Sequence, residues 1–211
     1  MDMVNKQLPT YADKAEALFF FPCFRLWFSL QGLCKLPWND IEPVDNGLKY
    51  KGIEAARVPE HLKNYLDIFE AITGKPLSRE GMILQSEKVY NFERIFNLRM
   101  GKGTSEFHHA PDRGLGPVWE DEWNARPEYF DEKLKEFGET IEGKSVKEKI
   151  DLLQKHRRSQ WEELKMAVYK RRGWNKNGIP TMATVKRLGI DYPDVVALLE
   201  KNLKPEDEFT D

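Results

Sequence analysis

One cysteine in a short glycine-containing segment is the residue of this chain with the clearest chemical potential. Cys34 follows Gly32 and Leu33 and precedes Lys35. Glycine favours a reversal of the chain, and a lysine beside a thiol favours the thiolate, which is the form that binds metal. A buried structural thiol is the alternative, because free cysteines are among the most buried residues. The segment therefore marks Cys34 as a candidate metal ligand.

Three other residues with metal-binding side chains favour structural roles. Cys23 lies inside an apolar stretch and is expected in the core. His108 and His109 are adjacent in a loop, so their side chains diverge, and a zinc site needs more ligands than two. We expect these histidines to be solvated or to cap a helix.

The charged residues near predicted helices are also assigned structural roles. Glu93, Arg94 and Arg99 are expected to form a buried ion-pair network between helices. Arg171 and Arg172 lie near a predicted helix C-terminus, where cations complement the helix dipole. The sequence identifies no catalytic acid or base, so the catalytic residues are left unknown.

The composition limits the partners and the compartment. The chain has 211 residues, 40% of them hydrophobic, and its 33 basic residues against 35 acidic ones give a net charge of -2. A basic field is absent, so no nucleic-acid partner is expected. Two cysteines provide no disulfide framework, and a cytoplasmic location is the default expectation.

The most apolar stretch is expected to be a buried helix and not a membrane span. The run that begins at Ala17 is interrupted by Pro22 and Arg25. A spanning helix needs about 20 apolar residues, which this stretch does not provide. Acidic residues precede the run, where a signal peptide would carry basic ones. We therefore expect neither a membrane partner nor a signal peptide.

Hydrophobic spacing and capping residues predict a chain built of helices. Ser78 and Thr181 are expected N-caps, and Ser145 with Glu148 has the pattern of a capping box. Helical periodicity with start and stop signals predicts helices over 10–30 with a kink at Pro22, 59–73, 78–101, 127–137, 145–173, 181–188 and 191–203. Residues 37–52 and 101–118 have the composition of loops. Because no alternating β pattern of any length occurs, the predicted fold class is all-α, an irregular helical domain with long loops.

The predicted domain organisation has four parts. Residues 1–118 form a helical region that contains the Gly-Leu-Cys loop. Residues 119–144 form a charged insertion, residues 145–205 carry the C-terminal helices, and residues 206–211 form a frayed tail. The charged insertion is most simply a solvated face, and it is also a candidate docking site for a partner subunit.

A series of short motifs resembles one known family. The motifs, in chain order, are Gly-Leu-Cys-Lys at 32–35, Ile-Thr-Gly at 72–74, Asn-Phe-Glu-Arg-Ile-Phe-Asn-Leu-Arg-Met-Gly at 91–101, Pro-Asp-Arg at 111–113 and Tyr-Lys-Arg-Arg-Gly-Trp-Asn-Lys-Asn-Gly-Ile-Pro-Thr at 169–181. Together they resemble the C-terminal helical region of the aldehyde:ferredoxin oxidoreductase family of tungsten enzymes. The resemblance covers nearly the whole chain from residue 29, and it fits the predicted helical domain.

The resemblance implies specific site residues. In that family the Gly-Leu-Cys segment supplies the fourth thiolate of a [4Fe-4S] cluster, and the same turn borders a tungsten bis-pterin cofactor. Cys34 is therefore the expected metal ligand, and Ser29, Gly32, Leu33 and Lys35 are the expected cofactor-binding residues. The implied activity is the oxidation of an aldehyde or a related oxo substrate, with electrons passed to a ferredoxin-like acceptor.

Two features of this sequence depart from the family pattern. The other three cluster cysteines of the family, a C-x2-C-x3-C run, have no counterpart here, and Ser29 stands where the family usually has an acid. One thiolate does not hold a four-iron cluster. We therefore expect the other cysteines on a missing N-terminal portion or a partner subunit, and we expect this chain to be inactive alone.

Two other functions remain open. The Ser29 variant and the long charged segment also resemble what is expected of the active-site subunit of tungsten benzoyl-CoA reductases, which belong to the same family. The alternative from a different class is a non-catalytic helical interaction domain. Under that reading, Cys34 would have no redox role.

Overall fold

The computed structural model describes residues 10–34 and 61–210 of the chain. Lys35 and the predicted loop 37–52 lie outside these residues. The all-α prediction is confirmed, because within the two described ranges the secondary structure is helical and no strand forms a sheet. Trp174 and Pro180 form an isolated antiparallel bridge.

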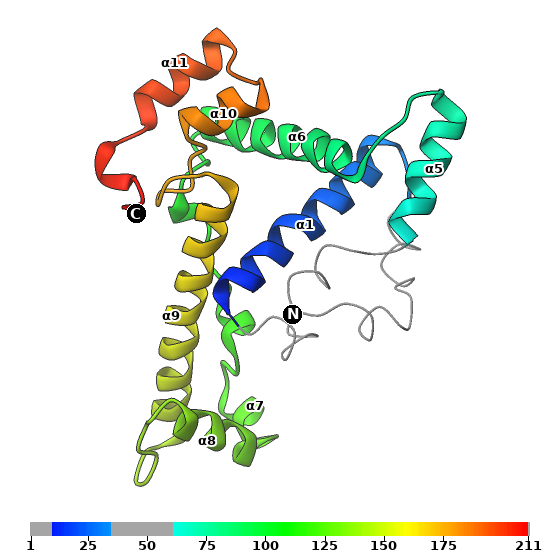
Figure 1. Cartoon of the computed structure of the whole chain (residues 1–211). Helices are drawn as coiled ribbons and strands as arrows, with labels where there is room; N and C mark the ends of the chain where they lie inside the picture. Colours follow the sequence, from blue (N-terminus) through cyan, green and yellow to red (C-terminus); the bar gives the residue numbers. More distant parts are fainter. Residues whose placement is uncertain (1–9, 35–60, 211) are drawn as a thin grey trace. The chain divides into compact units, whose positions relative to one another are not determined.

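Figure 1 shows the helices in chain order. They are α1 (Tyr11–Leu30), α5 (His61–Thr73), α6 (Arg79–Arg99), α7 (Glu120–Asn124), α8 (Pro127–Glu136), α9 (Val146–Arg172), α10 (Met182–Leu188) and α11 (Pro193–Asn202). Three short 3-10 turns accompany them: η1 (Ser105–Phe107), η2 (Asp112–Leu115) and η3 (Pro205–Asp207). The two 3-10 turns η1 and η2 lie in the segment predicted as loop, and α7 was not predicted.

The chain divides into two compact units. One contains the described residues up to Phe107 together with those from Met166 onward, and the other spans His108–Lys165. The long helix α9 contributes residues to both. The four domain boundaries proposed from the sequence remain predictions.

Helix α1 is the element that leads to the candidate site. It begins at a capping box in which the Thr10 hydroxyl accepts a hydrogen bond from the backbone N–H of Asp13. The helix continues through Pro22 to Leu30. Its buried apolar side chains form a cluster with residues of α6, against which residues of α5 also pack. The members from α1 and α6 are Phe19, Cys23, Phe24, Trp27, Phe28, Met82 and Ile83.

Helix α6 contacts α1, α5 and α10 (Figure 1). Its predicted N-cap is confirmed, since the Ser78 hydroxyl accepts a hydrogen bond from the N–H of Gly81. A second apolar cluster joins its C-terminal half to α10, α11 and the hairpin before α10. This cluster contains Ile95, Leu98, Ile179, Val185, Leu188, Ile190, Val195 and Leu199. The first unit therefore has two apolar centres along α6.

The second unit has its own small core. Trp123 of α7, Leu134 of α8 and Leu153 of α9 are buried together with Ile141 and Ile150. The predicted capping box at the start of α9 is confirmed, because the Ser145 hydroxyl and the Glu148 carboxylate bond reciprocally. The charged segment 119–144 thus contains two helices that bury apolar residues.

The C-terminal end of the chain begins with the turn η3. The Asp207 carbonyl accepts a hydrogen bond of 2.7 Å from the backbone N–H of Lys176. The start of the segment that was predicted as a frayed tail therefore contacts the loop before α10. Among the described residues, no helix is long and apolar enough to cross a membrane.

Candidate functional site

The segment before Cys34 is a helix-terminating turn. Gly32 has a φ of 70°, and its N–H donates to the Ser29 carbonyl at 3.1 Å. The Leu33 N–H donates to the Phe28 carbonyl at 2.9 Å. These two bonds and the left-handed glycine constitute a Schellman motif. Cys34 is the first residue beyond this hydrogen-bonded turn, so its backbone starts from a fixed position.

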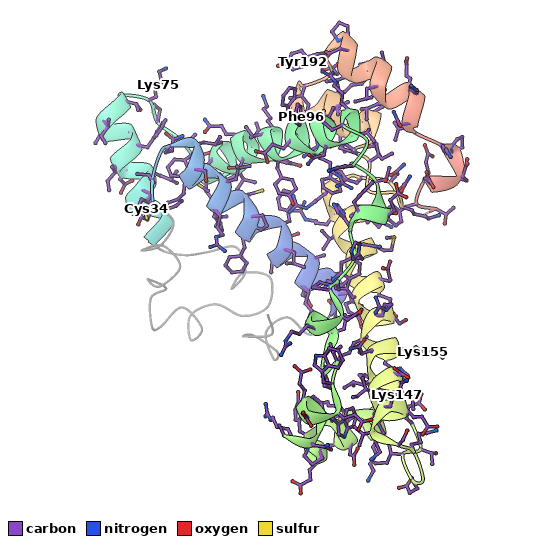
Figure 2. All side chains as sticks on the ribbon, turned by 180° about the vertical axis from the view of Figure 1, so that it is seen from behind. Cys34, Lys75, Phe96, Lys147, Lys155 and Tyr192 are labelled. Atoms are coloured by element: carbon purple, nitrogen blue, oxygen red, sulfur yellow. The ribbon has the colours of Figure 1, made fainter. Side chains whose placement is uncertain are left out.

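The turn is anchored on one side and open on the other. Trp27 and Phe28 of α1 are buried in the apolar core, whereas Cys34 is exposed. Leu30 and Leu33 also leave 42% and 41% of their surfaces accessible. Figure 2 shows Cys34 at the end of the described segment that follows α1. The alternative that Cys34 is a buried structural thiol is wrong for the described structure.

The predicted cofactor-binding residues occupy the same turn. The exposed Ser29 hydroxyl donates a hydrogen bond of 3.4 Å to the Arg25 carbonyl, so it presents a polar but uncharged group. A Cβ on Gly32 would meet no atom within 4 Å, so the positive φ and not a lack of space requires glycine there. Lys35 lies outside the described residues. Cofactor binding by these residues stays a prediction.

Cys23 has the opposite environment to Cys34. It is fully buried in the apolar cluster, as the sequence predicted. Burial raises the pKa of its thiol from 9.0 to about 11, although the nearby positive charge of Arg172 acts to lower it. A thiol in this state is protonated at neutral pH and is a poor metal ligand.

The expected ion-pair network of Glu93, Arg94 and Arg99 is wrong. Glu93 is exposed, and Arg99 pairs with Asp194 at 2.5 Å on the surface. The buried Arg94 instead donates from Nε to the Gly178 carbonyl at 2.8 Å. Its guanidinium also lies 5.0 Å from the centre of the Trp174 ring. A carbonyl and an aromatic face therefore hold Arg94, because the acid neighbouring it in sequence points to solvent.

A set of buried polar residues surrounds Trp174. Its Nε1–H donates to Asn91 Oδ1 at 2.7 Å, and the Asn91 amide donates to the Glu87 carbonyl at 2.9 Å. The carboxylate of Glu87 accepts two hydrogen bonds from Arg187. These contacts connect α6 with the hairpin before α10 and with α10 itself. They were not predicted, since the partners are far apart in sequence.

Arg171 and Arg172 contact α1 in addition to lying in the last turn of α9. Arg171 forms a bidentate ion pair with the buried Glu16. Arg172 is 3% exposed and donates from Nη2 to the Leu18 carbonyl at 2.8 Å. The suggested interaction with the helix dipole stays a prediction, whereas the contacts with α1 are specific.

Among the described residues, no group of three or more His, Cys, Asp or Glu side chains is placed to hold a metal ion. The described part of the chain therefore contains no complete metal site. The roles expected for His108 and His109 remain predictions. The His108 carbonyl accepts a hydrogen bond from Lys165 at 3.4 Å.

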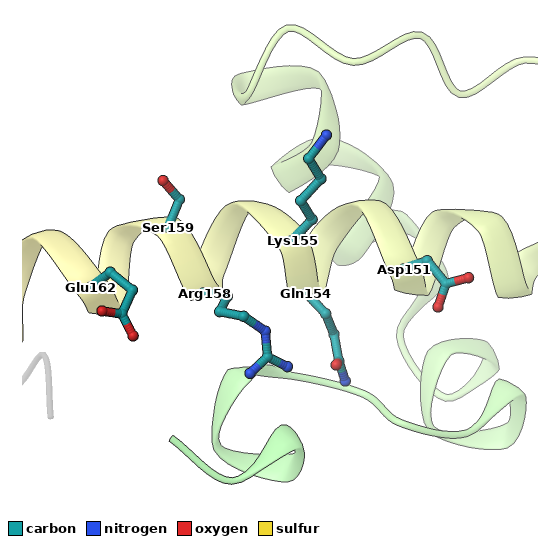
Figure 3. A pocket seen from close by; sticks show the side chains of 6 residues that line it. All are labelled: Asp151, Gln154, Lys155, Arg158, Ser159 and Glu162. Carbon is teal, nitrogen blue, oxygen red and sulfur yellow. The ribbon is translucent and has the colours of Figure 1, made fainter. Parts of the chain in front are cut away.

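A shallow depression follows the surface of α9 within the second unit. It is lined by Asp151, Gln154, Lys155, Arg158, Ser159 and Glu162. Figure 3 shows Gln154 and Arg158 pointing to a loop, where they bond the Pro117 carbonyl and the Asp112 carboxylate, while Lys155 and Ser159 point away. The depression is therefore a polar helix surface whose side chains do not converge.

Comparison with known proteins identifies the family. Residues 1–190 match the family model for aldehyde ferredoxin oxidoreductase, domains 2 and 3. Searches of curated proteins and of solved structures gave no match. The match spans most of the chain, including α1, the Cys34 turn and the Gly-Trp-Asn hairpin. This chain belongs to the aldehyde ferredoxin oxidoreductase family of oxidoreductases.

Proposed function

We propose that this chain supplies one thiolate ligand, Cys34, to a [4Fe-4S] cluster of an aldehyde:ferredoxin oxidoreductase. The observation that supports the proposal is the exposed position of Cys34 directly after a rigid Schellman turn. Family membership and the chemistry of cysteine thiolates agree with this role. The chain therefore serves as part of an electron-transfer path.

The donor set fits one corner of such a cluster. Cys34 presents an accessible sulfur, and the other cysteine, Cys23, is buried with a raised pKa. Three further thiolates must come from elsewhere, and we assign them to a missing N-terminal portion or a partner subunit. The exposed side chains of Leu30 and Leu33 flank the turn, and their burial by that portion would stabilise the assembly.

The residues of this chain act by holding the sulfur in place. The bonds from Gly32 and Leu33 to the end of α1 fix the backbone before Cys34, and Trp27 and Phe28 anchor that end in the core. When bound, the cluster supplies one-electron transfer. A fixed ligand keeps the distance for electron transfer constant, and the electrons would leave for a ferredoxin-like acceptor.

The same turn would border a tungsten bis-pterin cofactor at which an aldehyde is oxidised. Ser29, Gly32, Leu33 and Lys35 are the residues that we assign to these contacts. Ser29 offers a hydroxyl that can donate and accept hydrogen bonds but carries no charge. Replacing Ser29 with Ala is therefore expected to weaken cofactor retention only moderately, which metal and pterin analysis of the assembled enzyme would measure.

The test uses the assembled enzyme, in which the portion with the other three cysteines is present. Changing Cys34→Ser should alter the EPR spectrum of the reduced cluster and lower turnover with an aldehyde. Cys23→Ser is the matched control and should leave the spectrum unchanged, because this sulfur is buried in the core. An unaltered spectrum and full turnover in Cys34→Ser would refute the proposal.

Ser29 in place of an acid favours a second candidate within the family. In this alternative the chain is part of the active-site subunit of a tungsten benzoyl-CoA reductase. Assays of the assembled protein with an aldehyde and with an aryl-CoA thioester would distinguish the two reactions. Activity with neither substrate and no cluster in the assembly would favour a non-catalytic interaction domain.

A further inference from the structure

A proline inside α1 removes one hydrogen bond from the middle of the helix. In a regular helix the carbonyl of residue 18 accepts from the N–H of residue 22. Residue 22 is Pro22, which has no N–H, and yet the helix continues from Tyr11 to Leu30. The Leu18 carbonyl therefore needs a hydrogen-bond donor from outside the helix, because an unpaired backbone group away from water is costly.

Arg172 supplies that hydrogen bond. Its Nη2 donates to the Leu18 carbonyl at 2.8 Å. The guanidinium is almost completely buried and lies 4.0 Å from the centre of the Tyr90 ring, 5.5 Å from that of Phe19 and 5.6 Å from that of Trp174. Three aromatic rings and a carbonyl therefore lie around this cation, and the Cys23 thiol is also close to it.

Arg172 is buried beside the Leu18 carbonyl although burying its positive charge is energetically unfavourable. Its Nη1 has no hydrogen-bond partner in the described structure. Burying a cation that is not fully hydrogen-bonded is unfavourable. The favourable contacts with the Leu18 carbonyl and the rings must offset that cost, which indicates a specific role for Arg172 at this carbonyl.

The neighbouring Arg171 offers a comparison. It also contacts the part of α1 before Pro22, but through the carboxylate of Glu16 and the ring of Phe19, whose centre lies 3.8 Å from its guanidinium. None of its hydrogen bonds in the described structure goes to the Leu18 carbonyl. Arg171 is therefore a matched control, because it has the same charge and a similar location but does not bond the Leu18 carbonyl.

Helix α1 is thus held on both sides of Pro22, and the apolar cluster with α6 includes Phe19 before the proline as well as residues after it. Before the proline, the arginine pair contacts Glu16, Leu18 and Phe19. After it, Trp27 and Phe28 pack in the apolar cluster with α6 and contact the rings of α5. The second part ends in the turn that carries Cys34.

We infer that Arg172 replaces the hydrogen bond that Pro22 removes from α1 and that it is thereby a positioning residue for the Cys34 turn. The hydrogen bond is a property of the fold alone, whereas a role of Arg172 in positioning the Cys34 turn rests on the proposed function. Protein stability reports on the hydrogen bond, and the spectrum of the cluster reports on the position of the turn.

A double-mutant cycle on the full chain tests the hydrogen bond. In the Pro22→Ala background the N–H of residue 22 is restored, so the Leu18 carbonyl no longer depends on Arg172. Arg172→Met should therefore increase the unfolding equilibrium constant about fivefold less in this background than in the native one, the equivalent of one hydrogen bond. Denaturant titration followed by circular dichroism measures all four proteins.

Arg171→Met is the control and should have the same effect in both backgrounds. An equal effect of Arg172→Met in the two backgrounds would overturn the inference. If Arg172→Met leaves folded protein only in the Pro22→Ala background, the rescue supports it. If neither background folds in buffer, the same four proteins are compared in a stabilising osmolyte such as TMAO and judged by the same criterion.

The cluster of the assembled enzyme tests the positioning. Arg172→Lys should broaden or shift the cluster EPR signal, because the course of α1 before the turn changes, whereas Arg171→Lys should not. Identical spectra for both variants would overturn the positioning role. If Cys34→Ser also leaves the spectrum unchanged, the proposed function has failed, but the outcome of the stability cycle is unaffected.

Discussion

The two thiols of the chain differ in accessibility, and this difference predicts their reactivity. Cys34 is exposed and Cys23 is fully buried with a pKa raised to about 11. Under native conditions at pH 8, an alkylating reagent should modify Cys34 and leave Cys23 intact. Peptide mass spectrometry measures the two sites, and the unfolded chain is the control in which both react. Preferential modification of Cys23 would contradict the structure.

The raised pKa of Cys23 also predicts a pH dependence of stability. The unfolded thiol ionises near 9.0 and the folded one near 11, so the unfolded state binds fewer protons between these values. The stabilisation from the neutral buried thiol is complete below pH 9 and decreases as the pH rises towards 11. The loss amounts to about 2–3 kcal/mol.

A comparison of native chain and Cys23→Ala isolates this effect. Both proteins are unfolded with denaturant at several pH values from 8 to 11. The free energy of unfolding of the native chain should fall more steeply over this range than that of Cys23→Ala. Parallel curves would show that the thiol of Cys23 does not ionise differently in the two states.

The roles of single residues could be predicted where they depend on neighbours in the sequence. The turn at Gly32 and the candidate ligand Cys34 were evident from neighbouring residues, and so was the buried position of Cys23. The partners of Arg94 and Arg172 were not, because they include backbone carbonyls and aromatic side chains brought together only by the fold. The sequence suggested Glu93 as an ion-pair partner of Arg94, but Glu93 is exposed to solvent.

At the scale of elements, helix ends were predictable where a side chain caps the helix. Ser78, Ser145 and Thr181 all accept backbone hydrogen bonds at the predicted starts. The short helix α7 was missed because its five residues provide no periodicity. It is stabilised by Trp123, which is buried among residues that follow later in the chain.

The capping box of α9 predicts a measurable change in one pKa. The Ser145 hydroxyl donates to the Glu148 carboxylate and, with the backbone N–H of Ser145, lowers the pKa of that carboxyl below its ordinary value. Ser145→Ala should therefore raise the pKa of Glu148 towards that value and destabilise the helix by about 1 kcal/mol. NMR titration of the side-chain carboxyl measures the shift, and an unchanged pKa would contradict the structure.

Two glycines that follow helix ends, Gly173 after α9 and Gly189 after α10, are predicted to differ in the cost of substitution. Gly173 has a φ of 69°, and a Cβ there would overlap the Thr184 hydroxyl, which donates to the Gly173 carbonyl at 2.7 Å. Gly189 has a φ of 63°, but its Cβ would meet only the end of Lys88. Gly189→Ala should cost about 1–2 kcal/mol, and Gly173→Ala clearly more. Denaturant midpoints measure both, and equal costs would exclude the overlap.

At the scale of the whole molecule, the all-α class followed from the absence of β patterns, and the division into two compact units did not. The segment 119–144 was interpreted as a charged insertion because charges dominate its composition. The structure instead places Trp123, Leu134 and Ile141 from this segment in the core of the unit His108–Lys165. These side chains are buried by residues distant in the sequence, and the composition of one segment does not predict such contacts.

Binding of iron by the sulfur of Cys34 can be observed by NMR of that residue. This chain is prepared as Cys23→Ser with 13Cβ-cysteine, so that Cys34 carries the label, and is assembled with an unlabelled portion that supplies the other three thiolates. If Cys34 binds iron, its Cβ resonance will be shifted far outside the diamagnetic range by the cluster. A Cβ resonance at the position of an ordinary free thiol, in an assembly that contains the cluster, would contradict iron binding by Cys34.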